Sequence, residues 1–174
     1  MRSSRCLRHA KTRLRVAERM SSSRLPRRPL RAPVQVERRE WTIASDVQGI
    51  TPIVETVQSM CGAAGFSPRQ CRLNIPVAVT EALSNAILRG NACDLSRRVQ
   101  VVVMLDAVGL VVEVTDEGSG FDVESSLHTP ADADWLERED GRGLFLMRSL
   151  MDHVESRMPD DERGHTLRLI LRRA

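Results

Sequence analysis

The chain has 174 residues, of which 41% are apolar, and this length and composition support one compact domain with a hydrophobic core rather than two. Only five residues are aromatic and none is tyrosine, which argues against a base-stacking surface for nucleic acids. The single lysine, Lys11, lies near the amino terminus. The rest of the chain therefore has no lysine for a Walker A loop, for a eukaryotic-type kinase site or for a Schiff base.

Charge is distributed unevenly along the sequence. Residues 1–40 contain 13 Lys and Arg against three Glu, whereas residues 41–174 contain 13 basic and 20 acidic residues. The net charges of the two stretches are therefore about +10 and −7. An acidic domain is not expected to bind nucleic acid through its folded surface. Nucleic-acid binding stays open only for the basic tail, where it would weaken steeply with salt.

The cysteine pattern and the lengths of the apolar runs bear on the cellular compartment. The four cysteines form no C-x-x-C pair and have no histidines at zinc spacing, which argues against a metal site or a disulfide framework. Asp106 interrupts the longest apolar run, so no stretch reaches the roughly 20 residues that a membrane span needs. We therefore expect a cytoplasmic protein with reduced thiols and no membrane segment.

The first 33 residues differ in composition from the rest. Residues 1–33 are rich in Arg, Ser and Pro and lack a long apolar stretch, which predicts a disordered extension. The segment superficially resembles an organellar transit peptide or a nucleic-acid-binding arm, but a later translation start at Met20 explains it equally well. The predicted domain comprises residues 34–174.

This domain is expected to begin with a strand and a helix. Residues 34–36 and 41–43 carry strand-forming side chains, and the strand is expected to be interrupted near the charged run 37–40. Apolar residues then recur at three- and four-residue spacing over 50–61, which predicts an amphipathic helix.

A second, longer helix is expected next. Ser67 and Pro68 are typical of a helix start, because proline is favoured at the first helical position after an N-cap. The helical pattern continues to Asn91, and Pro76 predicts a kink or a restart near Asn74.

The second half of the chain is expected to supply the remaining strands. Two apolar segments, 99–105 and 110–115, flank a four-residue connection and predict a hairpin covered by helices. Residues 122–140 are acidic and aperiodic, which is typical of a lid or a disordered link. The remaining predicted elements are a short helix starting at Gly141 and strands at 154–158 and 165–172.

Three segments carry the candidate chemistry, and the first lies in the long helix. Glu81 and Asn85 are four residues apart, so a helix places both on one face about one turn apart. A carboxylate there can orient or deprotonate an attacking hydroxyl, while a neighbouring amide oxygen ligates Mg²⁺. Taken alone, such a pair is more often a plain solvated helix face.

The second segment begins at Asp116, directly after an apolar strand. An ionised aspartate at a strand end can accept a hydrogen bond from an exocyclic amine such as that of adenine, and Gly118 and Gly120 let the backbone pass close to the ring. A calcium loop does not fit, because these glycines stand where an EF-hand needs oxygen ligands. A dinucleotide fingerprint does not fit either, because Val123 replaces its third glycine. By itself the segment reads as an ordinary turn.

The third segment, Gly141-Arg142-Gly143-Leu144, ends the acidic loop and begins a helix. Free backbone amides at a helix start, together with the favourable end of the helix dipole, form a phosphate site. A plain helix start is the alternative interpretation.

In this order and at these spacings, the three segments resemble the N, G1 and G2 boxes of the GHKL ATPase superfamily. More narrowly, the chain resembles the bacterial anti-sigma-factor serine kinases of the RsbW and SpoIIAB type. The resemblance covers about residues 34–174, including Gly164-His165-Thr166, which matches the superfamily's Gly-x-Thr ending. It implies a Bergerat-type fold: an α+β, two-layer α/β sandwich with a mixed, mostly antiparallel sheet and helices on one face.

The resemblance also implies roles for individual residues. Glu81 would be the catalytic base, and Asn85 would ligate Mg²⁺. Asp116 would receive the adenine amine, assisted by Thr166. Arg89 stands where the family often has histidine, and an arginine there can still contact phosphate. The positions implied to shape the base pocket or to lie over the phosphates of ATP are Gly118, Gly120, Gly141, Arg142, Gly143 and Leu144.

For the whole protein, the resemblance implies an ATP- and Mg²⁺-dependent serine/threonine protein kinase. It would phosphorylate a serine on an anti-sigma-factor antagonist, sequester a sigma factor and form a homodimer. Two other interpretations stay open. One is a non-catalytic module in which ATP orders the lid and the partner surface. The other is a detached histidine-kinase catalytic domain, which needs a phosphoacceptor helix hairpin, whereas only His9 precedes residue 41.

Overall fold

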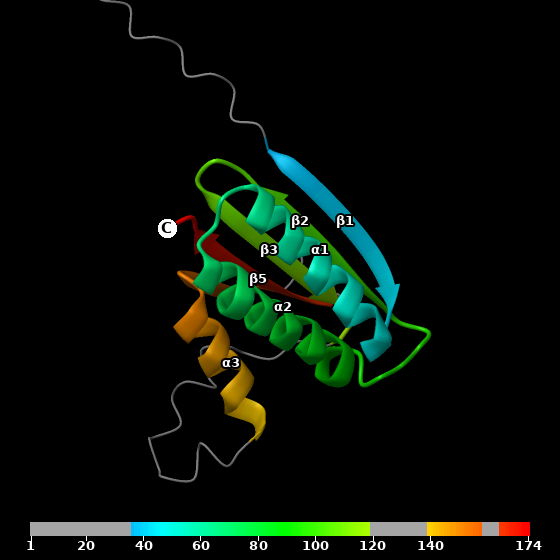
Figure 1. Cartoon of the computed structure of the whole chain (residues 1–174). Coiled ribbons are helices and arrows are strands. Elements are labelled where there is room, and N and C mark those ends of the chain that lie inside the picture. The colour runs from blue at the N-terminus through cyan, green and yellow to red at the C-terminus, as the bar shows by residue number, and fades with distance from the viewer. Residues whose placement is uncertain (1–35, 119–138, 158–163) are drawn as a thin grey trace, which may run out of the picture. The chain divides into compact units, whose positions relative to one another are not determined.

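The computed structural model describes residues 36–118, 139–157 and 164–174, all within one compact unit, Pro33–Ala174 (Figure 1). The predicted N-terminal extension and residues 122–138 of the predicted lid lie outside the described residues. Within the described part, no helix is both long and apolar enough to cross a membrane.

Among the described residues, five strands form one sheet in the order β1-β2-β3-β5-β4, and each of the four pairings between them is antiparallel. The antiparallel order confirms the α+β class. The bounds of the strands are β1 Glu37–Ala44, β2 Arg98–Leu105, β3 Gly109–Asp116, β4 His153–Arg157 and β5 His165–Arg172.

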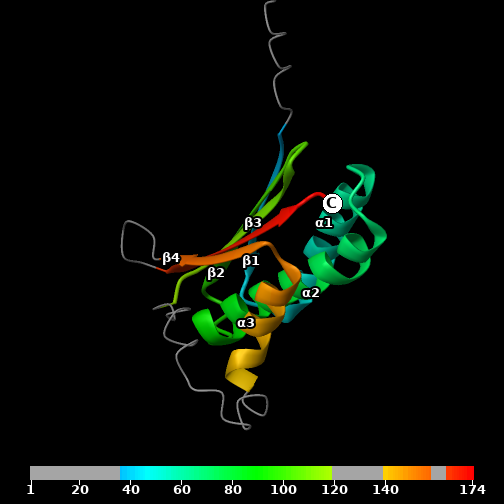
Figure 2. The same ribbon diagram turned by 90° about the vertical axis from the view of Figure 1, so that its left-hand side faces the viewer.

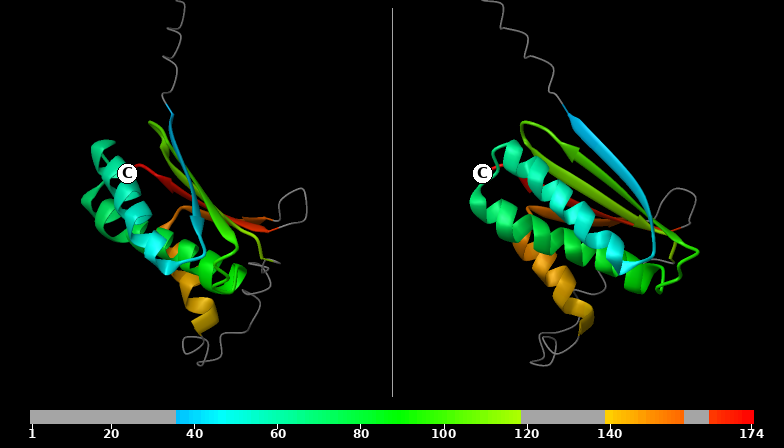
Figure 3. Two further views of the ribbon diagram at one scale, coloured as in Figure 1. Left: turned by 90° about the vertical axis from the view of Figure 1, so that its right-hand side faces the viewer. Right: turned by 45° about the vertical axis from the view of Figure 1, so that its right-hand side comes forward.

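In the part of the chain that the structure describes, three α-helices lie on one face of this sheet (Figures 2 and 3). They are α1 (Ile50–Ala63), α2 (Ile75–Ser84) and α3 (Glu139–Leu150), and α2 packs between the other two. Residues of β2 alternate between buried and more exposed positions, as expected for a sheet with one covered face. The largest fully buried side chains come from both layers and include Ile53, Ile75, Leu83, Ile87, Leu110, Met147 and Leu169.

Strand β1 runs without the interruption that we expected at residues 37–40. Every residue of Glu37–Ala44 has a register partner on β2. The strand lies at the edge of the sheet, where charged side chains remain in water and do not disturb the ladder. Trp41 and Ile43 are its half-buried residues, and they pair with Val101 and Val99.

The long helix predicted up to Asn91 contains two wider, π-helical turns that flank α2. The first covers Gln70–Asn74, and the Ile75 amide donates to the Gln70 carbonyl five residues back. Pro76, which has no amide hydrogen, follows at the start of α2, so the pitch changes where a restart was expected. The second wide turn covers Asn85–Gly90 and ends with the Asn91 amide donating to Ala86.

Helix α3 begins at Glu139, two residues before the start predicted at Gly141. As a result, Gly141 lies in the first turn of α3 and Gly143 follows in the next.

Candidate functional site

Glu81 and Asn85 lie at the carboxyl end of α2 and the start of the wide turn that follows it, and both are partly buried. They face the first turns of α3. A methyl group at Gly143 would lie 2.6 Å from Glu81 Oε2 and 3.8 Å from Asn85 Nδ2. The structure thus brings together residues that the sequence analysis singled out in two separate segments; we call Glu81, Asn85 and Gly143 the Glu81 group.

A second group gathers around Asp116 at the end of β3. Asp116 is 5% exposed, and its Oδ1 accepts a hydrogen bond from the Gly118 amide at 2.8 Å. Burial raises the pKa of this carboxyl, whereas the Gly118 hydrogen bond and the charges of His165 and Arg97 lower it. An acceptor at this position is thus buried and held in one orientation by the backbone.

Glycine is required where the wide helical turn meets Asp116. A Cβ at Gly90 would collide with the Asp116 carboxyl, and a Cβ at Gly118 would collide with the Gly90 backbone carbonyl. The helix end and the segment after β3 therefore approach at backbone distance. Sequence reasoning had assigned a role to Gly118 but not to Gly90.

Asn91 is a further residue that the sequence analysis did not single out. It is fully buried, and its amide nitrogen donates to Ser45 Oγ at 2.6 Å and to the Arg98 carbonyl at 2.9 Å. Its side-chain oxygen accepts the Glu117 amide at 2.8 Å. Asn91 thereby ties together the end of β1, the start of β2 and the end of β3. We call Gly90, Asn91, Asp116 and Gly118 the Asp116 group.

The structure does not bring Thr166 to Asp116. In the ladder between β3 and β5, Asp116 is opposite His165, and Thr166 is opposite Thr115. The side chains of register partners point to the same face of a sheet, and successive residues of one strand point to opposite faces. Asp116 and His165 therefore share one face, and Thr166 lies on the other. Its hydroxyl is hydrogen bonded to the Thr115 hydroxyl at 2.9 Å. The strand register instead makes His165 the neighbour of Asp116 on the same face.

The other residues assigned to the phosphates are spread over two helices. Arg89 is exposed on the wide turn, and Arg142 is exposed on α3. Leu144 is 4% exposed and belongs to the hydrophobic core, so only its backbone is available to a ligand. Gly141 lies in the first turn of α3, and Gly120 lies outside the described residues.

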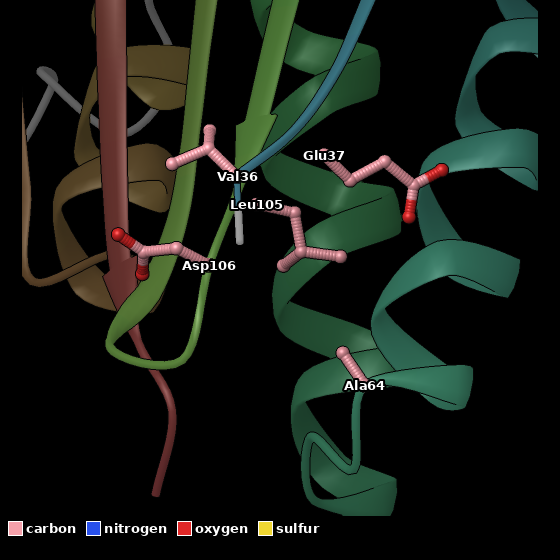
Figure 4. Close-up of a pocket in the computed structure, with 5 residues that line it drawn as sticks. All are labelled: Val36, Glu37, Ala64, Leu105 and Asp106. Atoms are coloured by element: carbon pink, nitrogen blue, oxygen red, sulfur yellow. The ribbon is translucent and has the colours of Figure 1, made fainter. Parts of the chain in front are cut away.

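A pocket of about 450 Å³ lies elsewhere in the fold (Figure 4). Its lining includes Glu37, Ala64 and Asp106, and none of the residues of the two groups. Asp106 follows β2 at the hairpin turn, whereas Asp116 ends β3 at the opposite end of the hairpin. The pocket is therefore separate from the candidate site.

Residues 43–171 match the family model of the histidine kinase-like ATPase domain. The match covers most of the chain, and the chain belongs to this family. Family membership confirms the GHKL resemblance and implies that the domain binds ATP.

The chain is also similar to curated proteins named serine-protein kinase RsbW from Listeria monocytogenes, including those of strains HCC23 and EGD-e. The sequences are 28% identical over 106 residues, which cover 58% of this chain and 66% of each relative. The match thus spans slightly less than two thirds of the relatives' length. Within the family, the chain is thus similar to proteins of the RsbW type.

Proposed function

We propose that this protein is an ATP-dependent serine/threonine protein kinase that phosphorylates a serine on an anti-sigma-factor antagonist and sequesters a sigma factor. The observation that carries the proposal is the contact of Glu81 with Gly143, because it sets a carboxylate and an amide against the start of a helix. The name of the RsbW relatives supports the serine-kinase assignment. The proposed partners, homodimer and cytoplasmic location rest on the resemblance to that type of kinase.

In the proposed binding mode, the Asp116 group receives the base. Asp116 Oδ1 is engaged by the Gly118 amide, so Oδ2 is the oxygen proposed to accept the adenine amine. Gly118 shapes the surface against which the ring lies, and Gly120 is proposed to extend it. Thr166 is not included, because its hydroxyl bonds Thr115 on the opposite face.

The Glu81 group and α3 are proposed to hold the phosphates. The amides of the first turn of α3, including that of Gly141, are oriented toward the helix start, where an anion is stabilised. Gly143 allows α3 to approach Glu81 closely, and the Leu144 backbone continues the same turn. Arg89 and Arg142 are the proposed cationic contacts.

The donor set at Asn85 fits Mg²⁺. This ion prefers oxygen ligands and typically takes only one or two from protein, with phosphates and water supplying the rest. Among residues 36–118, 139–157 and 164–174, no cluster of three or more His, Cys, Asp or Glu could hold a metal, so an all-protein cage is not found there. Asn85 would hold the ion with the phosphates, where it neutralises charge on the transferred group.

Glu81 is proposed to act as the general base. Its carboxylate would take the proton of the antagonist's serine hydroxyl as that oxygen bonds to the γ-phosphorus. The bond from phosphorus to the bridging oxygen then breaks, and ADP leaves with the electron pair. This chemistry needs positioning and charge neutralisation and no covalent intermediate, so a domain without lysine can perform it.

The test is transfer of labelled phosphate from ATP to a purified serine-bearing candidate antagonist. Glu81→Ala is expected to reduce transfer by a factor of roughly 10² or more while ATP affinity is retained, because a base acts on the proton and not on the nucleotide. Glu55→Ala, which removes an exposed carboxylate from α1, is the matched control and is expected to transfer normally.

Unchanged turnover in Glu81→Ala would contradict the role of Glu81. ATP binding by the wild-type protein without any transfer to serine would contradict the kinase assignment and indicate a nucleotide-dependent binding module instead.

A further inference from the structure

Asp116 and His165 form a buried pair that the proposed function uses only in part. They are register partners on β3 and β5, so their side chains share the helix-covered face of the sheet. Asp116 Oδ2 and His165 Nδ1 are 3.9 Å apart, and the two side chains are 6% and 3% exposed. This distance is too long for a hydrogen bond, but it permits an electrostatic interaction between the two side chains.

The other nitrogen of the His165 ring has its own partner. Nε2 is hydrogen bonded to the hydroxyl of Ser156 on β4. A hydroxyl can donate or accept a hydrogen bond, so Ser156 can pair with either tautomer of the His165 ring. The Asp116 carboxylate beside Nδ1 favours a proton on that nitrogen, and Ser156 then donates to Nε2. Ser156 thereby holds the ring with Nδ1 on the side of Asp116.

We propose that His165 is a positioning residue of the nucleotide site: held by Ser156, it keeps the Asp116 carboxylate ionised and oriented to accept the exocyclic amine of adenine. The inference rests on the proposed function and adds to it a residue that acts through Asp116. It takes the place that the sequence analysis had given to Thr166.

The surroundings of the pair support this role. Among the described residues, Arg97 is the other charged residue that acts on the Asp116 carboxyl besides His165. Arg97 donates a hydrogen bond to the Gly90 carbonyl at 3.4 Å and forms a salt bridge with Asp94 at 3.7 Å. The wide helical turn presents the uncharged Gly90 to Asp116, and β4 presents the uncharged Ser156 to His165. Burial lowers the pKa of His165, and the Asp116 charge opposes that effect.

The test measures the affinity of the full-length protein for Mg²⁺-ATP by calorimetry from roughly pH 5 to pH 8, which spans the ordinary titration range of histidine. His165→Gln removes the partner that favours the ionised carboxylate, so Asp116 takes up a proton at higher pH. The acid-side loss of affinity is therefore expected to move to higher pH. On the alkaline side, affinity is expected to change by less than about threefold.

The matched control is His153→Gln, because His153 is an exposed imidazole on β4 that pairs with Glu155. Its pH profile is expected to coincide with that of the wild type. A His165→Gln profile that is weakened equally at every pH, or that coincides with the wild type, overturns the inference while leaving the proposed function intact. A wild-type protein that binds no Mg²⁺-ATP at any pH overturns both.

Two further measurements do not depend on the folding of His165→Gln. Ser156→Ala keeps the imidazole but removes its anchor, and it is expected to move the acid-side loss in the same direction by a smaller amount. Nitrogen NMR of histidine-labelled wild-type protein reads the tautomer directly, and we expect the proton of His165 on Nδ1 at neutral pH. A proton on Nε2 alone, or an unshifted Ser156→Ala profile, overturns the inference.

Discussion

In the Asp116 group, hydrogen bonds join side chains to backbone, and the glycines lie close to neighbouring atoms. In the Glu81 group, two side chains approach the backbone of Gly143 on a neighbouring helix. The Asp116 group is buried, and Asn91 alone connects three strand ends within it. Glu81 and Asn85 are only partly buried. One end of the proposed ATP site is thus part of the folded core, and the other is attached to its surface.

Because of this difference, substitutions in the two groups are expected to affect different properties of the protein. A change in the Asp116 group is expected to lower both the free energy of unfolding and the affinity for nucleotide, because the same contacts serve both. A change in the Glu81 group is expected to affect phosphate transfer and to leave stability nearly unchanged. The predictions below test this separation, beginning with the largest expected effect.

The strongest test at the Asp116 group is Gly118→Ala. The added methyl group would collide with the Gly90 carbonyl, and backbone atoms cannot move aside as a flexible side chain can. We expect the free energy of unfolding to fall by about 3 kcal/mol, as in other overpacked sites, and ATP binding to be lost with it. Denaturant titration and calorimetry measure the two effects.

Gly62→Ala is the matched control for that change. No atom lies within 4 Å of a Cβ at Gly62, and alanine is favoured over glycine in a helix. The control is expected to be neutral or stabilising by up to about 1 kcal/mol. Equal stability of Gly118→Ala and Gly62→Ala would contradict the close backbone approach at the Asp116 group.

Asn91→Ala is expected to have the next largest effect. It removes three hydrogen bonds and leaves buried partners unsatisfied, which we expect to cost about 2 kcal/mol of stability and to weaken ATP binding. Asn74→Ala is the control, since Asn74 donates one hydrogen bond, to the Leu150 carbonyl, away from the Asp116 group. It is expected to lose less stability and to bind ATP normally, and equal losses of affinity would count against the special role of Asn91.

Gly143→Ala probes the Glu81 group. The new methyl group would lie 2.6 Å from Glu81 Oε2, and the flexible carboxylate can move away. We expect stability to change by less than about 0.5 kcal/mol, whereas the displaced base lowers transfer by at least roughly tenfold. A drop in melting temperature as large as that of Gly118→Ala would show that the two groups do not differ in the way described.

The smallest effect concerns the pH dependence of stability. Burial lowers the pKa of His165 below its ordinary value of 6.5, so the unfolded chain takes up a proton that the folded chain does not. Its contribution to stability is therefore lost as the pH falls from 6.5 toward the lowered value. The raised pKa of Asp116 acts in the opposite sense, because the folded form takes up its proton before the unfolded form does as the pH falls.

His165→Gln is expected to flatten the decline of melting temperature below about pH 6.5, where the unfolded histidine titrates. His153→Gln, which removes an exposed imidazole, is expected to keep the wild-type slope. Identical slopes in the wild type and His165→Gln would contradict the burial of the neutral ring.

Sequence reasoning found the parts of the site that local patterns encode. Helical spacing placed Glu81 and Asn85 on one face, and the end of an apolar strand marked Asp116. It missed Gly90 and Asn91 because their contacts depend on tertiary approach between a helix end and the segment after β3. The misplacement of Thr166 has a different cause, since a shift of one residue in strand register reverses every side chain.

For the fold as well, the features set by local sequence patterns could be predicted, and those set by the position of a strand in the sheet could not. The hairpin of β2 and β3 and the start of α2 after Asn74 agree with their patterns, because alternation and proline chemistry act locally. The continuity of β1 was not predictable from its charged residues, because an edge position in the sheet is what makes those charges harmless.

Asn85 and Gly90 belong to one wide helical turn, so a single piece of backbone holds both the ligand proposed for magnesium and the contact with Asp116. That turn fixes the distance between the two residues, because the spacing between Asn85 and Gly90 is set by the helix itself. In the proposed binding mode, the distance between the contacts for the base and for the phosphates is therefore fixed by one turn of backbone.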